Sequence, residues 1–112
     1  MKAASILLGT VALVIGASAN ALTVKEFKIL RNDARVTNYV YGVGNGMVWA
    51  NTELIARHGQ PLFCAPGTLV LNEENYLTLL DGEIQSEKSK VKDDSPVEPI
   101  LFAALEKAFV CK

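Results

Sequence analysis

The chain has 112 residues, half of them hydrophobic, and its 11 basic and 12 acidic side chains leave a net charge of −1. A chain of this length fits a single domain. Its nearly balanced charge lacks the basic footprint of a nucleic-acid-binding protein or of a cationic membrane-surface binder, so we expect neither class of function.

The first 21 residues predict a secretory signal peptide. Lys2 gives a positive start, residues 3–17 are almost entirely apolar, and Ala19-Asn20-Ala21 forms an A-x-A cleavage site. The apolar run is shorter than the about 20 residues that a membrane-spanning helix needs, and an uncleaved N-terminal anchor is the alternative. We therefore expect cleavage after Ala21, a periplasmic location, and a mature domain of residues 22–112 that leaves the membrane.

Cys64 and Cys111 are the only cysteines, and an exported protein meets an oxidising environment. We expect them to form a disulfide that closes a long loop and stabilises a domain too small to depend on its core alone. His58 is the only histidine, and no other ligand is placed near it, so neither a metal nor a cofactor is expected.

The mature chain is predicted to begin with two helices. Thr23-Val24-Lys25-Glu26 has the T-x-x-E pattern of a capping box, which predicts a short helix as far as about Asp33. A long central helix follows from about Ala34 to His58, because apolar residues recur at steps of four and three: Val36, Val40, Val43, Met47, Ala50 and Leu54. A second stripe of Tyr41, Val48 and Ile55 indicates that this helix packs on two sides.

Three glycines lie within the central helix, at a cost of roughly 1 kcal/mol each against alanine. Gly42 and Gly46 are one turn apart, and we expect them to permit close approach of another backbone. The alternation of glycine with β-formers makes a strand over Tyr39–Trp49 the alternative, although the helical spacing continues on both sides. Since the helix carries more apolar area than one small bundle covers, we also expect a homodimer.

Two further helices are predicted after a connector. Residues 60–71 should lie against the bundle, with a short strand over Thr68–Leu71 as an alternative. Asn72 is a suitable N-cap for a third helix, whose apolar face holds Tyr76, Leu77, Leu80 and Ile84. Ser95-Pro96-Val97-Glu98 resembles a second capping box, and the last helix carries an apolar stripe that would point Cys111 inward. The predicted fold is an all-α, compact four-helix domain with one disulfide.

No catalytic constellation is present in the sequence, since carboxylates are scattered and no hydroxyl has a neighbouring base, so we do not expect an enzyme. Two regions could bind a protein partner. The segment from Gln85 to Ser95 is predicted to be solvated and mobile, and it offers both signs of charge through Lys88, Lys90, Lys92, Asp93 and Asp94. Trp49 could anchor a partner from the polar side of the central helix. The alternatives are an ordinary linker and a tryptophan packed under the connector.

The order of these motifs resembles the Rap/Tai family of bacterial immunity proteins, which protect cells from toxins delivered by type VI secretion. The matching motifs are Tyr41-Gly42-x-x-x-Gly46, Cys64-x-Pro66 and Ala104-Leu105-x-x-Ala108-Phe109-x-Cys111. Val110 departs from the family pattern, which usually has proline there. The resemblance implies a helical, periplasmic and often dimeric protein that inhibits a peptidoglycan amidase-like effector by occupying its active-site groove. A small periplasmic chaperone or stress protein is the alternative function.

Overall fold

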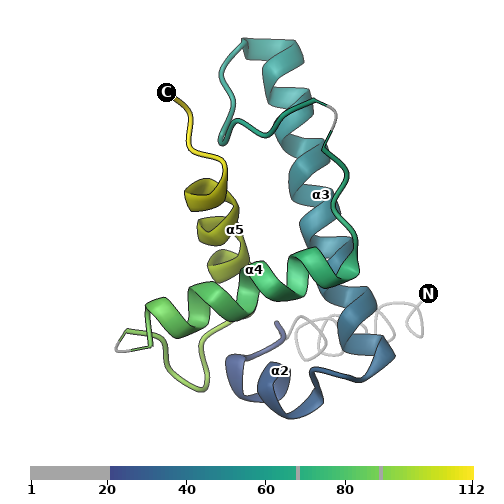
Figure 1. Cartoon of the computed structure of the whole chain (residues 1–112), viewed down its shortest axis with the longest axis vertical. Helices are drawn as coiled ribbons and strands as arrows, with labels where there is room; N and C mark the ends of the chain where they lie inside the picture. Colours follow the sequence, from purple (N-terminus) through teal and green to yellow (C-terminus); the bar gives the residue numbers. More distant parts are fainter. Residues whose placement is uncertain (1–20, 68, 89) are drawn as a thin grey trace, which may run out of the picture.

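The computed structural model describes residues 21–67, 69–88 and 90–112. This part of the chain forms four helices, α2 (Val24–Leu30), α3 (Ala34–His58), α4 (Glu73–Ser86) and α5 (Val97–Ala108) (Figure 1). It contains no β-strand, only an isolated antiparallel bridge between Thr23 and Pro96. The predicted all-α fold of four helices is therefore confirmed. The predicted signal peptide, apart from Ala21, lies outside the described residues.

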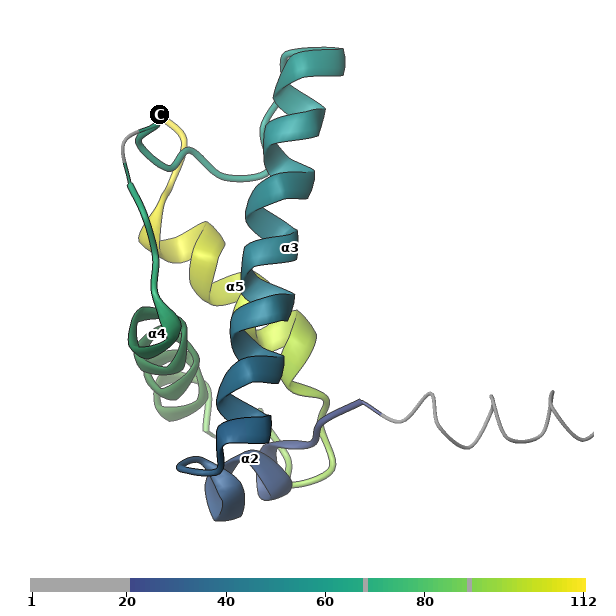
Figure 2. The same cartoon turned by 90° about the vertical axis from the view of Figure 1, so that its right-hand side faces the viewer.

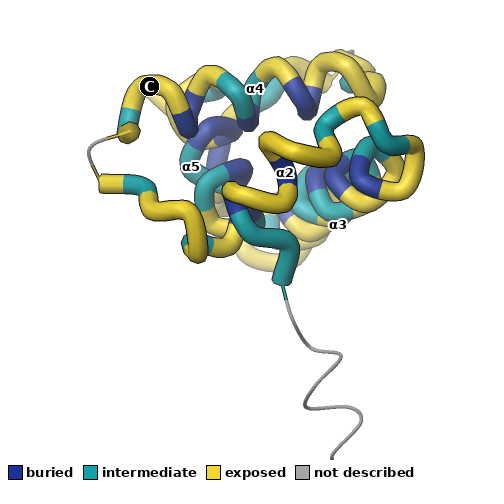
Figure 3. The backbone as a smooth tube through the Cα atoms, turned by 90° about the horizontal axis from the view of Figure 1, so that it is seen from below, coloured by how far each residue is buried: buried dark blue, intermediate teal, exposed yellow. Residues whose placement is uncertain are grey.

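The helices pack around one apolar core. α4 runs across both α3 and α5 and contacts each of them, and α2 lies beside the start of α3 (Figures 1 and 2). The buried positions of all four helices face one another at the centre (Figure 3). The largest fully buried side chains in this core are Tyr76, Phe27, Phe63, Leu80, Leu101 and Leu105.

α2 begins at the predicted capping box. The Thr23 hydroxyl accepts a hydrogen bond from the Glu26 amide, and the Glu26 carboxylate accepts one from the Thr23 amide. The helix ends at Leu30 and not near Asp33, because Asp33 caps the next helix by accepting from the Arg35 amide at 2.8 Å. Ile29 is 68% exposed, because the short helix turns only Val24 and Phe27 to the core.

α3 is a continuous helix of 25 residues, so the strand alternative over Tyr39–Trp49 is wrong. Its end agrees with the prediction: Gly59 has a left-handed φ of 71°, and its amide donates to the Ile55 carbonyl. Its buried positions, however, are Val36, Val40, Gly44 and Asn51, whereas Ala50 is exposed. The difference arises because the predicted seam repeats every 3.5 residues, whereas a straight helix has 3.6 residues per turn. The seam therefore turns away from the core by about 20° per heptad.

The glycine prediction is also corrected. Within this chain, a Cβ at Gly42 or Gly46 would meet nothing within 4 Å, so no other part of the described chain approaches them closely. The close approach is instead at Gly44, where the partner is the buried ring of Tyr76 from α4. Contact of Gly42 and Gly46 with a second copy stays a prediction.

α4 has the predicted N-cap and the predicted apolar face, since Asn72 accepts from the Asn75 amide and Tyr76, Leu77, Leu80 and Ile84 are all buried. The connector before it is not a strand over the described residues 69–71. The cap depends on residues within one helical turn, and the apolar face depends on the helical spacing of residues along α4.

α5 starts without the predicted capping box. Its N-cap is Pro96, and the Ser95 hydroxyl accepts from the Lys92 amide and caps nothing in the helix. The Val97 amide instead donates to the Leu22 carbonyl at 2.9 Å, so the segment before α2 satisfies the start of α5. The helix ends at Ala108, which places Cys111 beyond it and on the surface, contrary to the predicted inward orientation.

Candidate functional site

The predicted disulfide between Cys64 and Cys111 is present, joining positions 47 residues apart with their Cα atoms at 4.9 Å. Beside it, the Cys64 amide donates to the Phe109 carbonyl at 2.7 Å. Both cysteines are exposed. The bridge therefore acts as a surface tie between the connector after α3 and the chain that follows α5.

Phe63 anchors the connector in the core, one residue before the bridge. Its ring packs edge-on against Phe102 at a centroid distance of 6.4 Å and lies 6.5 Å from the ring of Phe109. The connector thus lies against the bundle, as the sequence predicted, through a buried Phe63 that contacts two partly buried rings.

Asn51 holds the same connector from the side of α3. Its side-chain amide donates to the Phe63 carbonyl at 2.8 Å, and its oxygen accepts from the Leu62 amide at 2.6 Å and from the Phe63 amide at 3.3 Å. The side chain is only 5% exposed. Sequence reasoning missed this residue. A polar side chain beside the apolar seam, in the middle of a helix, was the available signal.

A groove of about 470 Å³ lies between α3 and this connector. The predicted second stripe of α3 forms one wall, and the connector together with Tyr76 of α4 forms the other. None of its lining side chains is charged: Tyr41, Asn45, Val48, Trp49, Asn51, Thr52, Ile55, Phe63, Ala65, Pro66, Gly67, Leu69, Val70, Leu71 and Tyr76. Burial raises the pKa of the Tyr76 hydroxyl, so that ring is neutral as well.

Large apolar side chains stand exposed around this groove. Trp49 is 65% exposed and Val70 is 86% exposed, and Leu69 and Ile55 are also exposed. Trp49 therefore does not pack under the connector, which was the structural alternative considered from sequence. An exposed tryptophan beside an uncharged groove is a surface suited to an apolar partner.

The charged segment before α5 has more contacts with the rest of the chain than predicted. The side chains of Lys88, Lys90, Lys92, Asp93 and Asp94 are exposed. Its backbone, however, is hydrogen-bonded to the start of α2: the Lys25 amide donates to the Asp93 carbonyl at 3.0 Å and the Val24 amide to the Ser95 carbonyl at 2.9 Å. Val91 also packs against the core. Hydrogen bonds and this apolar contact join the second half to α2 and to the core, contacts that the prediction of a solvated segment did not include.

The two predicted partner surfaces do not meet in the fold. The charged segment joins α4 to α5 close to α2. The connector runs along the C-terminal half of α3, the half that lies away from α2 (Figure 1). Beside the charged segment, Lys107 of α5 pairs with Glu83 at 2.8 Å and with Glu87 at 3.0 Å. The hydrogen bond from Lys107 lowers the pKa of Glu87, and these contacts tie α4 to α5.

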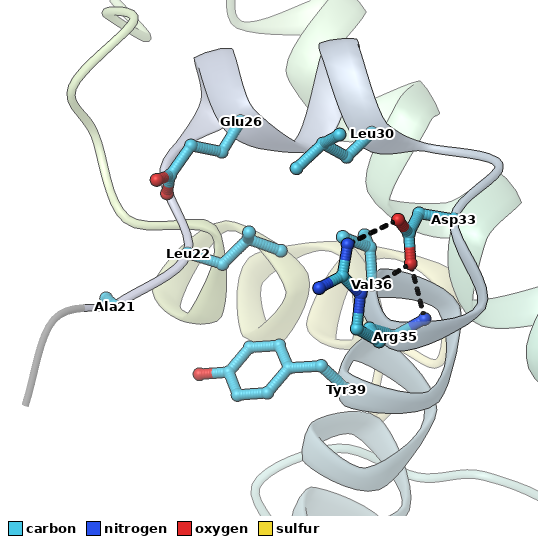
Figure 4. Close-up of a pocket in the computed structure, with 8 residues that line it drawn as sticks. All are labelled: Ala21, Leu22, Glu26, Leu30, Asp33, Arg35, Val36 and Tyr39. Carbon is cyan, nitrogen blue, oxygen red and sulfur yellow. Dashed lines mark hydrogen bonds and ion pairs between the residues drawn. The ribbon is translucent and has the colours of Figure 1, made fainter. Parts of the chain in front are cut away.

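A second cavity, of about 370 Å³, lies where the N-terminal segment meets α2 and α3 (Figure 4). Asp33 and Arg35 form an ion pair at its edge, at 2.9 Å, and the hydrogen bond from Arg35 lowers the pKa of Asp33 to about 2. Tyr39 lies opposite, and its hydroxyl donates to the Glu98 carboxylate, which raises the pKa of Tyr39 to about 12.

The described residues contain no group of three or more His, Cys, Asp or Glu side chains arranged to hold a metal ion. Among the described helices, none is both long and apolar enough to cross a membrane. No family model, curated protein or solved structure matches this chain. The resemblance to the Rap/Tai family therefore stays a prediction, carried by the motifs of the chain itself.

Proposed function

We propose that this protein is a periplasmic immunity-type protein that binds and inhibits a cell-wall-degrading, peptidoglycan amidase-like effector. The observation that supports binding is the uncharged groove with Trp49 and Val70 exposed beside it. Tryptophan is among the residues most enriched at the energetic centres of protein interfaces. The class of partner comes from the Rap/Tai resemblance, and a disulfide is compatible with the oxidising compartment that such a protein would occupy.

The groove is well suited to bind without rearrangement. Asn51 fixes the connector to α3, and the Cys64–Cys111 bridge fixes it to the end of α5. A wall held in place before binding loses less conformational entropy when the partner arrives. We therefore place the principal contact at the groove, with Trp49 as its anchor.

A small periplasmic chaperone is the second candidate, because the same exposed apolar side chains would also bind unfolded chains. The two functions differ in the number of clients. An immunity-type protein should retain one stoichiometric partner, whereas a chaperone should retain many unrelated ones.

Affinity capture from periplasmic extract, with the native protein and Trp49→Ala, tests the proposal. Ile29→Ala is a matched control, since Ile29 is equally exposed but lies on α2. We expect one partner that degrades peptidoglycan, that is inhibited at equimolar ratio, and whose affinity falls at least tenfold with Trp49→Ala only. Many clients, or a captured partner without peptidoglycan-degrading activity, would contradict the proposed role.

A second variant separates the groove from the charged segment. Replacing Lys88, Lys90 and Lys92 by Gln removes three charges and leaves the backbone bonds of Asp93 and Ser95 in place. A Gly/Ser linker would be a poorer test because it also removes the packing of Val91. If only the triple variant loses inhibition, the contact lies on the charged segment and not at Trp49.

A further inference from the structure

Glu98 has a carboxylate with one satisfied oxygen and one unsatisfied oxygen. Its Oε2 accepts a hydrogen bond from the Tyr39 hydroxyl. Its Oε1 is buried and has no hydrogen-bond partner among the described residues. A buried carboxylate oxygen without a donor loses its hydration without replacement, and such groups in folded proteins call for an explanation.

Leu22, the predicted first residue of the mature chain, is hydrogen-bonded to the start of the helix that carries this carboxylate. The Leu22 carbonyl accepts from the amide of Val97, the residue before Glu98, and Thr23 bridges Pro96. Leu22 and Ala21 also line the same cavity as Tyr39, the residue that holds Glu98 (Figure 4). The bond to Val97, the bridge to Pro96 and the cavity shared with Tyr39 thus bring the Leu22 backbone and the Glu98 carboxylate to one region.

We propose that the Glu98 carboxylate is the binding site for the α-ammonium group of Leu22, created when the signal peptide is cleaved after Ala21. Before cleavage the Leu22 nitrogen is an amide with one hydrogen and no charge. After cleavage it is a cation with three donors, which can satisfy Glu98 Oε1 with a charge-assisted hydrogen bond. The inference depends on the predicted cleavage position and not on the proposed function.

The charges around the cavity favour a cation. Glu26 lines it from α2, Asp33 and Arg35 lie at the start of α3, and Glu98 approaches through Tyr39 from α5. Among the described residues, the one guanidinium that lines the cavity is already paired with Asp33, and the carboxylates of Glu26 and, behind Tyr39, Glu98 have no cationic partner there. The Thr23 amide and hydroxyl both donate to Oε1 of Glu26, and Glu26 is exposed, so water can hydrate its other oxygen. Glu98 differs because its unsatisfied oxygen is buried.

The contact makes folding depend on pH in a defined direction. A carboxylate partner raises the pKa of an ammonium group in the folded state above its ordinary value of about 7.7–8.0. The stabilisation is complete below that value and is lost as the pH rises through the higher folded pKa. The processed protein should thus become less stable under mildly alkaline conditions.

The test begins with the full chain, exported and recovered from the periplasm. Mass spectrometry should show a product that starts at Leu22, and NMR titration of its α-amino group should give a pKa about one unit above the ordinary value. Glu98→Gln should return that pKa to the ordinary range. The matched control Glu106→Gln, which changes an exposed glutamate of the same helix, should not.

Two results would overturn the proposal. One is a product that begins at any other residue or keeps the leader. The other is an α-amino pKa in the native protein at or below 8.0, a measurement that needs no variant and so is independent of whether Glu98→Gln folds.

Discussion

Gly44 of α3 lies directly against the ring of Tyr76 of α4. A Cβ at Gly44 would be 2.9 Å from Tyr76 Cγ and closer still to Cδ1 and Cε1, distances that real Cβ atoms do not reach. Tyr76 cannot easily move away, because it is buried and packs edge-on against Tyr41 at a centroid distance of 5.9 Å. Glycine at this position is what lets α4 cross α3 at close range.

Gly44→Ala should therefore destabilise the fold by about 1–3 kcal/mol, the usual range for overpacking, despite the better helix propensity of alanine. Gly42→Ala and Gly46→Ala are matched controls in the same helix with open space at the Cβ position. At concentrations where the protein is monomeric, they should stabilise it by up to about 1 kcal/mol. Urea unfolding followed by circular dichroism measures all three, and a Gly44→Ala protein as stable as the controls would contradict the packing argument.

We propose that the protein forms a homodimer through the face of α3 that carries Gly42 and Gly46. Gly46→Leu should then weaken the dimer without affecting the fold, because the site is open within the chain. Analytical ultracentrifugation at micromolar concentration is the measurement. A native protein that sediments only as a monomer would refute this prediction.

Removing the Asn51 side chain should destabilise the connector. In Asn51→Ala the Phe63 carbonyl and two backbone amides lose their partner, and one buried unpaired group costs about 1–3 kcal/mol. Thr52→Ala, which removes an exposed neighbour, serves as the control. Denaturant unfolding should show the lower stability, and hydrogen exchange should show faster exchange of the Phe63 amide. Exchange at the native rate would be evidence that Asn51 does not hold the connector.

The disulfide should make a large contribution to stability. Replacing Cys64 and Cys111 together by Ser should lower the free energy of unfolding by about 2–5 kcal/mol, since the loop they close is long. Mass measurement with and without reductant, in the presence of an alkylating agent, should find the bridge in the exported protein. Free thiols in the native protein would show that the bridge does not form in the cell.

The cap of α3 should give the protein a specific sensitivity to acid. Hydrogen bonds from Arg35 hold the pKa of Asp33 at about 2, below its usual 3.8. A depressed pKa means that the stabilisation is complete above about pH 4 and is lost as the pH falls towards 2. Asp33→Asn keeps an acceptor for the Arg35 amide but cannot titrate.

The thermal midpoint of Asp33→Asn should therefore fall less between pH 4 and pH 2 than that of the native protein. Glu106→Gln removes an exposed carboxylate elsewhere and should behave like the native protein. Equal losses in the native protein and Asp33→Asn would mean that the ion pair does not contribute.

The local features of the sequence predicted most of the secondary structure correctly. The caps at Thr23 and Asn72 and the left-handed Gly59 each depend on residues within about one turn, and the apolar face of α4 depends on the spacing of residues within one helix. The pairing of Cys64 with Cys111 also followed, because the chain offers no other cysteine.

The remaining features depended on partners distant in the sequence. The Ser95–Glu98 capping box did not form because the Ser95 hydroxyl and amide are bonded to Lys92 and the Glu98 carboxylate accepts from the distant Tyr39. Gly42, Gly44 and Gly46 are equivalent as residues, and only the position of Tyr76, some thirty residues later, makes Gly44 the point of contact.

The groove beside Trp49 also depends on partners that are distant in the sequence. Its second wall exists only because Asn51 fixes the connector to α3 and the disulfide fixes it to the chain after α5. A sequence pattern reports the preferences of neighbouring residues. The choice among several equivalent glycines, carboxylates or apolar faces is made by the packing of elements that meet only in the folded chain.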